Sequence, residues 1–180
     1  MTTYISLLRG INVNGKNRIT MDALRKSYGN LGFGSVRTYV QSGNVVFTAN
    51  DAQAEELAQK ITQQIKKDFG VDVPVIVLTI DQLQHIVDSN PFLEHGDTNE
   101  NSLYITFLSS YPHNIDIPTI EAKKLRNEEV FFAGNAVYLY CHDGYGNTKL
   151  TTGFFETKLN LHATTRNWKT TNTLLQMALQ

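Results

Sequence analysis

Residues 35–48 read SVRTYVQSGNVVFT, and this stretch decides the fold class. The runs 35–40 and 44–48 are rich in valine, tyrosine and phenylalanine, which favour β-strands. The residues between them end in Gly43 and are typical of a tight turn, so the stretch predicts a β-hairpin. The strands of a hairpin are antiparallel, which argues against the parallel sheet of doubly wound enzymes.

The pattern extends to both sides of this hairpin. Residues 3–8 are an apolar run typical of a buried strand, and Thr20 is placed to cap the helix that follows. After the hairpin, Asn50 or Asp51 would cap a second helix, and residues 72–78 predict a further strand. The order strand–helix–strand–strand–helix–strand is that of ferredoxin-like domains.

The second half of the chain repeats this theme less completely. Residues 102–108 predict a strand, and a hairpin is expected across the Gly-Asn pair at 134–135. Two helices are then predicted, over residues 152–161 and 170–179. In this interpretation a helix takes the place of the last strand.

We therefore predict an α+β fold of tandem ferredoxin-like (βαββαβ) α/β plaits with antiparallel sheets, the second extended by C-terminal helices. The expected domains are residues 1–79 and 80–180, or a single intertwined domain. Thr79 and Gln82 have capping-box spacing for the first helix of the second half. The polar stretch EHGDTNEN at 94–101 is the best linker candidate.

Charge is distributed unevenly along the 180 residues, although the net charge is only −1. Residues 1–50 hold six basic side chains and one acidic one, whereas residues 51–100 hold ten acidic side chains and three lysines. The first segment could attract anions, or the two segments could neutralise each other in the fold. The single cysteine, Cys141, and an N-terminus without a leader or membrane-spanning pattern predict a cytoplasmic location and no membrane partner.

Gly10, Gly15 and Lys16 have the spacing of a phosphate-binding P-loop, but Asn17 stands where that motif has serine or threonine. The next helix is expected to start too late for the lysine to lie in its first turn, so nucleotide hydrolysis is disfavoured. Two interpretations stay open, a looser anion site and a structural turn. The basic and amide side chains that would form the anion site are Arg9, Asn12, Lys16 and Arg18.

Three further loops could contribute. Ser42 and Asn44 lie on the neighbouring hairpin. Lys149 follows a glycine-containing loop, and Arg166 precedes Trp168 between the two predicted helices. Lys149 and Arg166 would join the site only if the second half folds back over that surface. The alternatives are a flexible connection around Lys149 and a Trp168 that fills the gap between helices.

No catalytic grouping stands out, so enzyme activity is left open and no cofactor or metal is predicted. The histidines at 85, 95, 113, 142 and 162 lack metal-ligand spacing. Cys141 and His142 are neighbours in a strand and point to opposite faces, so Cys141 is expected to fill the core. An RNA-recognition domain has the same element order, but residues 42–47 match its aromatic motif only in a glycine and a phenylalanine.

Four stretches together are distinctive: LLRGINVNGKNRITMDALR (7–25), VRTYVQSGNVVF (36–47), NPF (90–92) and ATTRNWKT (163–170). Over residues 4–175 the chain resembles an uncharacterised, mostly bacterial family known as domain of unknown function 1697. The family commonly has glycine at the position of Asn14, asparagine at that of Lys169 and serine at that of Thr148. The resemblance implies two ferredoxin-like plaits and no particular activity.

The functional hypothesis from sequence is the binding of a small anionic or phosphate-bearing ligand. The alternatives are an RNA-binding module and a structural or protein-interaction domain without catalysis. The oligomeric state is not predicted. The candidate ligand-binding residues are Arg9, Asn12, Lys16, Arg18, Ser42, Asn44, Lys149 and Arg166.

Overall fold

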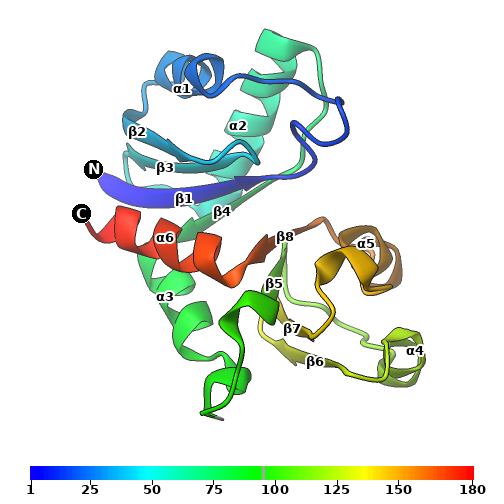
Figure 1. The fold of residues 1–180 in the computed structure, drawn as a ribbon. Coiled ribbons are helices and arrows are strands. Elements are labelled where there is room, and N and C mark those ends of the chain that lie inside the picture. The colour runs from blue at the N-terminus through cyan, green and yellow to red at the C-terminus, as the bar shows by residue number, and fades with distance from the viewer. Residues whose placement is uncertain (95) are drawn as a thin grey trace. The chain divides into compact units, whose positions relative to one another are not determined.

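Two four-stranded antiparallel sheets organise the chain (Figure 1). A computed structural model describes residues 1–94 and 96–180. Its backbone forms two units, which we describe separately: unit 1 is Met1–His85 with Thr173–Gln180, and unit 2 is Ile86–Asn172. The proposed linker at 94–101 includes His95, which lies outside the described residues.

The sheet of unit 1 has the strand order β2-β3-β1-β4, and every neighbouring pair is antiparallel. This is the predicted ferredoxin-like topology, because the central strand β1 pairs with both β3 and β4. The elements are β1 (Thr2–Leu8), α1 (Met21–Asn30), β2 (Gly34–Tyr39), β3 (Asn44–Ala49), α2 (Ala54–Phe69) and β4 (Val75–Thr79).

Both faces of the first sheet are buried. On one face Tyr4, Leu8 and Phe47 pack against α1 and α2, which cover the same side of the sheet (Figure 1). On this face the Tyr28 hydroxyl shares a 2.7 Å hydrogen bond with Ser6, and burial raises the pKa of Tyr28. On the other face the alternate residues, among them Ile5, are also buried.

The sheet of unit 2 has the order β6-β7-β5-β8 and is also antiparallel throughout. Its core side chains include Leu139 and Phe155. The elements are β5 (Leu103–Leu108), α4 (Ile117–Lys123), β6 (Glu128–Ala133), β7 (Ala136–Cys141), α5 (Thr152–Leu159) and β8 (Ala163–Asn167). The remaining described elements are α3 (Ile80–Asp88), α6 (Trp168–Leu179) and 3₁₀ turns at Pro91–Glu94, Glu100–Ser102 and Tyr145–Asn147.

The second half contains the last strand that the sequence interpretation omitted. The helix predicted over 152–161 ends at Leu159, where Asn160 takes a left-handed conformation, and Ala163–Asn167 then forms β8. The prediction of a helix in place of this strand was wrong. The strand pairs with β5 over its whole length, and these partners are distant in sequence.

Helix starts were predicted with mixed success. The hydroxyl of Thr20 accepts the N–H of Ala23 at 3.2 Å, which confirms the first cap. The expected cap at Asn50 or Asp51 was wrong, because α2 begins at Ala54. The carboxylate of Asp51 instead accepts a hydrogen bond from the Tyr4 hydroxyl at 3.4 Å. Among the described residues, no helix has the length and apolar character needed to cross a membrane.

Candidate anion-binding site

The glycine-lysine motif in the first loop is a miniature hairpin. Val13 and Lys16 form an antiparallel bridge, and the Lys16 N–H donates to the Val13 carbonyl at 2.9 Å. The two residues between them, Asn14 and Gly15, both have positive φ, at 50° and 74°. Positive φ at both central positions is the geometry of a type I′ turn, for which Asn-Gly is the preferred pair. Four residues separate Lys16 from α1, which begins at Met21, and this further distinguishes the loop from a P-loop.

This geometry also accounts for Asn14, where the resemblance leads us to expect glycine. A left-handed residue is required there, and asparagine is the non-glycine residue that tolerates this conformation best. The substitution therefore leaves the turn intact.

Asn12 holds the first loop against the β2–β3 hairpin. Its Nδ2 donates to the Ile19 carbonyl and to the Gln41 carbonyl, both at 2.8 Å. Its Oδ1 accepts the Ile19 N–H at 2.9 Å. Because these contacts use both amide hydrogens, Asn12 shapes the loop and has no further amide hydrogen for a ligand.

Gly43 allows the hairpin to approach the end of β1 closely. Its N-terminal neighbours form the turn, and its carbonyl accepts the Leu8 N–H at 2.8 Å. A Cβ at Gly43 would lie 2.6 Å from the Leu8 Cβ, so no larger residue fits. The Asn44 amide donates to the Ser42 hydroxyl at 2.8 Å and to the Tyr39 carbonyl at 3.0 Å. Ser42 and Asn44 thus brace the turn.

A hollow of about 420 Å³ lies between the first loop and the hairpin turn. Its lining includes the Arg18 side chain, whose Nη2 lies 3.6 Å from the position of a Cβ on Gly15. Lys16, two residues before Arg18, is exposed. The residues that line the hollow are Asn12, Gly15, Arg18, Ile19, Thr20 and Gln41, and none of them is acidic.

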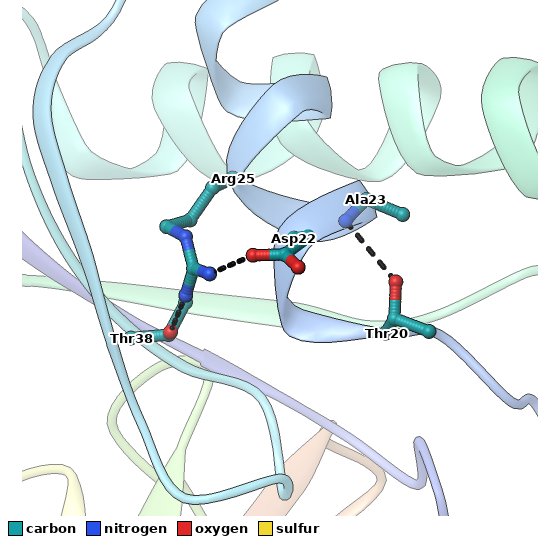
Figure 2. Close-up of polar contacts among 5 residues, drawn as sticks. All are labelled: Thr20, Asp22, Ala23, Arg25 and Thr38. Atoms are coloured by element: carbon teal, nitrogen blue, oxygen red, sulfur yellow. Dashed lines mark hydrogen bonds and ion pairs between the residues drawn. The ribbon is translucent and has the colours of Figure 1, made fainter.

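The nearest acidic side chain in sequence is paired elsewhere. Figure 2 shows the Asp22 carboxylate directed at Arg25, with which it forms an ion pair, rather than at Thr20. Arg25 also donates to the Thr38 hydroxyl at 2.5 Å. Within the described part of the chain, no ion pair involves Lys16 or Arg18.

Arg9, Lys16 and Arg18 lie in the same loop, but they are placed differently. Arg9 is half-buried, and its backbone N–H donates to the Pro74 carbonyl at 2.9 Å. It does not line the hollow, whereas Arg18 does. Of these three cations, Arg18 is the one that lines the hollow, and Lys16 is an exposed neighbour in the same loop.

Lys149 and Arg166 belong to unit 2. Lys149 is exposed, whereas Arg166 lies in β8 with 8% of its surface accessible. The Arg166 Nη1 donates to the Thr164 hydroxyl at 2.7 Å and to the Thr165 carbonyl at 2.9 Å. Burial lowers the pKa of Arg166 to about 10, so the side chain stays charged at neutral pH.

The sequence Arg-Asn-Trp at 166–168 is the junction between a strand and a helix. The Asn167 Oδ1 accepts the Thr170 N–H at 2.8 Å, as a helix N-cap does. Trp168 begins α6 and is buried. Arg166 and Asn167 thus lie between the helices α5 and α6, as predicted, but in a strand, and Trp168 is part of α6 instead of filling a gap between helices.

Cys141 and His142, the neighbours that the sequence analysis considered, lie in different environments. Cys141 is buried, as predicted for a core residue, and burial, with a smaller effect of the nearby Glu128 carboxylate, raises its thiol pKa to about 12. His142 next to it is exposed. No group of three or more potential metal ligands occurs in residues 1–94 and 96–180.

Sequence reasoning did not place Ile19, Thr20 or Gln41 around a binding site, although all three line the hollow. The Gln41 position depends on the contact between its carbonyl and Asn12, 29 residues earlier. No local pattern encodes such a contact. Thr20 was recognised only as a helix cap, the role that its hydroxyl also has here.

Comparisons with known proteins agree with the architecture. The chain resembles a solved structure titled as the conserved bacterial protein SP0830 from Streptococcus pneumoniae, with a TM-score of 0.73 and 27% sequence identity over 98% of both chains. No curated protein matches the sequence. The family described as "Protein of unknown function (DUF1697)" matches residues 1–138. The chain therefore belongs to the DUF1697 family.

Proposed function

We propose that unit 1 binds a small anionic, phosphate-bearing molecule in the hollow beside the first loop. The observation that carries this proposal is the pairing of an accessible Arg18 with a lining that contains no carboxylate. Arg25 in α1 has an acidic partner, Asp22, whereas among the described residues no ion pair involves Arg18. An arginine without one is suited to an external anion.

The chemistry of the two cations fits a tetrahedral oxyanion. The Arg18 guanidinium can donate two parallel hydrogen bonds to a pair of oxygens, and the Lys16 ammonium adds a mobile point charge. Each charge-assisted hydrogen bond contributes about 1.5–3 kcal/mol. The bracing of the loop by Asn12 keeps the hollow open before the ligand arrives, which lowers the entropic cost of binding.

RNA binding on the sheet, one of the alternatives from the sequence, has less support. RNA-recognition domains stack bases on exposed aromatic side chains of the sheet face. In unit 1 the β1 and β3 side chains on the face away from α1 and α2 include Ile5, Leu7 and Val46, which are aliphatic and buried. A protein-interaction role through the acidic segment remains the other candidate, and a cytoplasmic location remains a prediction.

The test is isothermal titration calorimetry with inorganic phosphate and with ribose 5-phosphate. We expect Arg18→Gln to weaken binding by about 10-fold to 100-fold, in line with the loss of one charge-assisted contact. Lys16→Gln should weaken it less, because the lysine lies outside the lining. Lys26→Gln is the matched control. Lys26 is an exposed lysine of α1, and its replacement removes the same charge elsewhere in unit 1.

If Lys26→Gln weakens phosphate binding as much as Arg18→Gln does, the effect is general electrostatic attraction and not a site at the hollow. If neither phosphate compound gives a measurable heat of binding, the proposal loses its support.

A further inference from the structure

The two sheets differ in how their hairpin edge strands are protected. In unit 1 the edge strand β2 contains a register shift between Gly34 and Arg37, and Ser35 has a φ of 47°. Arg37 also donates to the Met177 carbonyl at 2.6 Å, within the same unit. Bulges and covering contacts of this kind prevent an edge from pairing with another strand.

The corresponding edge strand of unit 2, β6, lacks this protection. Its six residues pair with β7 in unbroken register from Glu128 to Ala133. The sequence EEVFFA contains no lysine, proline or glycine, and its charged residues lie at one end of the strand: Glu128, which is buried and accepts the Leu125 N–H, and the exposed Glu129. Among the described residues no other strand pairs with β6, so its outward N–H and C=O groups have no strand partner.

The side chains of β6 are more apolar than an exposed edge requires. Phe131 is 48% exposed. Val130 and Phe132 point to the other face, where they are only partly buried against the core of unit 2. An uncovered, regular and apolar edge is a surface on which a further strand can add.

We propose that β6 pairs antiparallel with β6 of a second copy of this chain, with the two-fold axis at Phe131. The four-stranded unit 2 sheets of the two copies would then form one eight-stranded sheet. Opposed residues of an antiparallel pair point to the same face of the sheet, and alternate residues of a strand share a face. When both strands are copies of β6, the numbers of two opposed residues must therefore both be even or both be odd, so their sum is even. Any register centred on a residue satisfies this condition. Centring on Phe131 pairs residues 129–133, whereas centring on Val130 would place Glu129 opposite Phe131.

This register suits the side chains of β6. Phe131 would face Phe131 of the second copy, and Val130 would face Phe132 of the second copy on the helix-covered side. Glu129 would face Ala133, so the acidic residues are not opposed. A register centred two residues earlier would place Glu129 against itself, which like-charge repulsion disfavours. The strand is therefore complementary to its own copy.

The pairing is expected to be weak and reversible. A single six-residue strand contact is smaller than the about 1,200–2,000 Å² buried by stable interfaces. Sedimentation velocity from about 5 µM to about 500 µM should show a concentration-dependent shift from monomer to dimer. Phe131→Lys should abolish the shift, whereas Val40→Lys, at a residue that is 51% exposed in unit 1, should preserve it.

The register is tested by cysteine cross-linking. Under mild oxidation Phe131→Cys should form a disulfide-linked dimer, because the two substituted positions face each other across the axis. Glu129→Cys should not, but the double variant Glu129→Cys with Ala133→Cys should. Peptide mapping separates these bonds from any involving the buried Cys141.

A monomer over the whole concentration range would overturn the proposal. Dimerisation that survives Phe131→Lys, or cross-linking of Glu129→Cys as efficient as that of Phe131→Cys, would overturn it equally.

Discussion

Replacement of Asn12 by alanine tests whether this side chain builds the first loop. The substitution removes hydrogen bonds of 2.8, 2.8 and 2.9 Å. At about 1 kcal/mol each, these contribute about 3 kcal/mol to the free energy of unfolding. Asn12 also has a φ of 55°, which alanine tolerates poorly, so a further loss of about 1 kcal/mol is expected.

The total expected for Asn12→Ala is thus a loss of about 4 kcal/mol. Asn12→Gly loses the same hydrogen bonds but accepts the left-handed conformation, so its loss should be about 1 kcal/mol smaller. The loop cannot simply detach at no cost, because Ile11 and Ile19 on either side of it are buried in the core of unit 1.

The assay is urea unfolding at pH 7 followed by circular dichroism, with the slope of the transition compared among variants. A loss below about 1 kcal/mol for Asn12→Ala would refute the assignment of Asn12 as the residue that holds the loop. Hydrogen exchange gives a local check. The Ile19 amide, which donates to the Asn12 Oδ1, should exchange faster in both variants than in the wild type.

Two further predictions follow from close packing and burial. Gly43→Ala should destabilise the protein by more than about 3 kcal/mol in thermal unfolding, because the new Cβ would clash with Leu8 and the φ of Gly43 is 81°. Gly29→Ala is the control: it lies at an open position of α1 and should stabilise the protein by up to about 1 kcal/mol. Cys141 is buried and should resist thiol reagents at pH 8 until the protein is unfolded. Burial raises its thiol pKa in the folded protein from the ordinary 9.0 to about 12. The contribution of the neutral thiol to stability should therefore be complete below about pH 9 and lost as the pH rises towards about 12.

Local signals in the sequence predicted much of the fold. The capping box is confirmed, since the Thr79 N–H donates to the Gln82 Oε1 at 3.0 Å and the Gln82 N–H to the Thr79 Oγ1 at 3.2 Å. The hairpin across Gly134 is confirmed as well, with Ala133 paired to Ala136. In each case the residues that specify the feature are within a few positions of one another.

The errors arose where distant contacts override local preference. The strand β8 is fixed by its pairing with β5, about 60 residues earlier, and it runs directly into α6 without a turn residue between them. The start of α2 was misplaced because Asp51 is used by Tyr4, 47 residues away. For the same reason the sequence pointed to cations in the first loop but not to the hollow, whose shape depends on the Asn12–Gln41 contact.

The most direct test of the proposed anion site is a two-dimensional ¹H–¹⁵N NMR titration with ribose 5-phosphate. The account predicts saturable shifts at the amides of Gly15, Arg18, Thr20 and Gln41, the residues around the hollow, and their loss in Arg18→Gln. Shifts spread evenly over the basic surface, or confined to other parts of the chain, would contradict it.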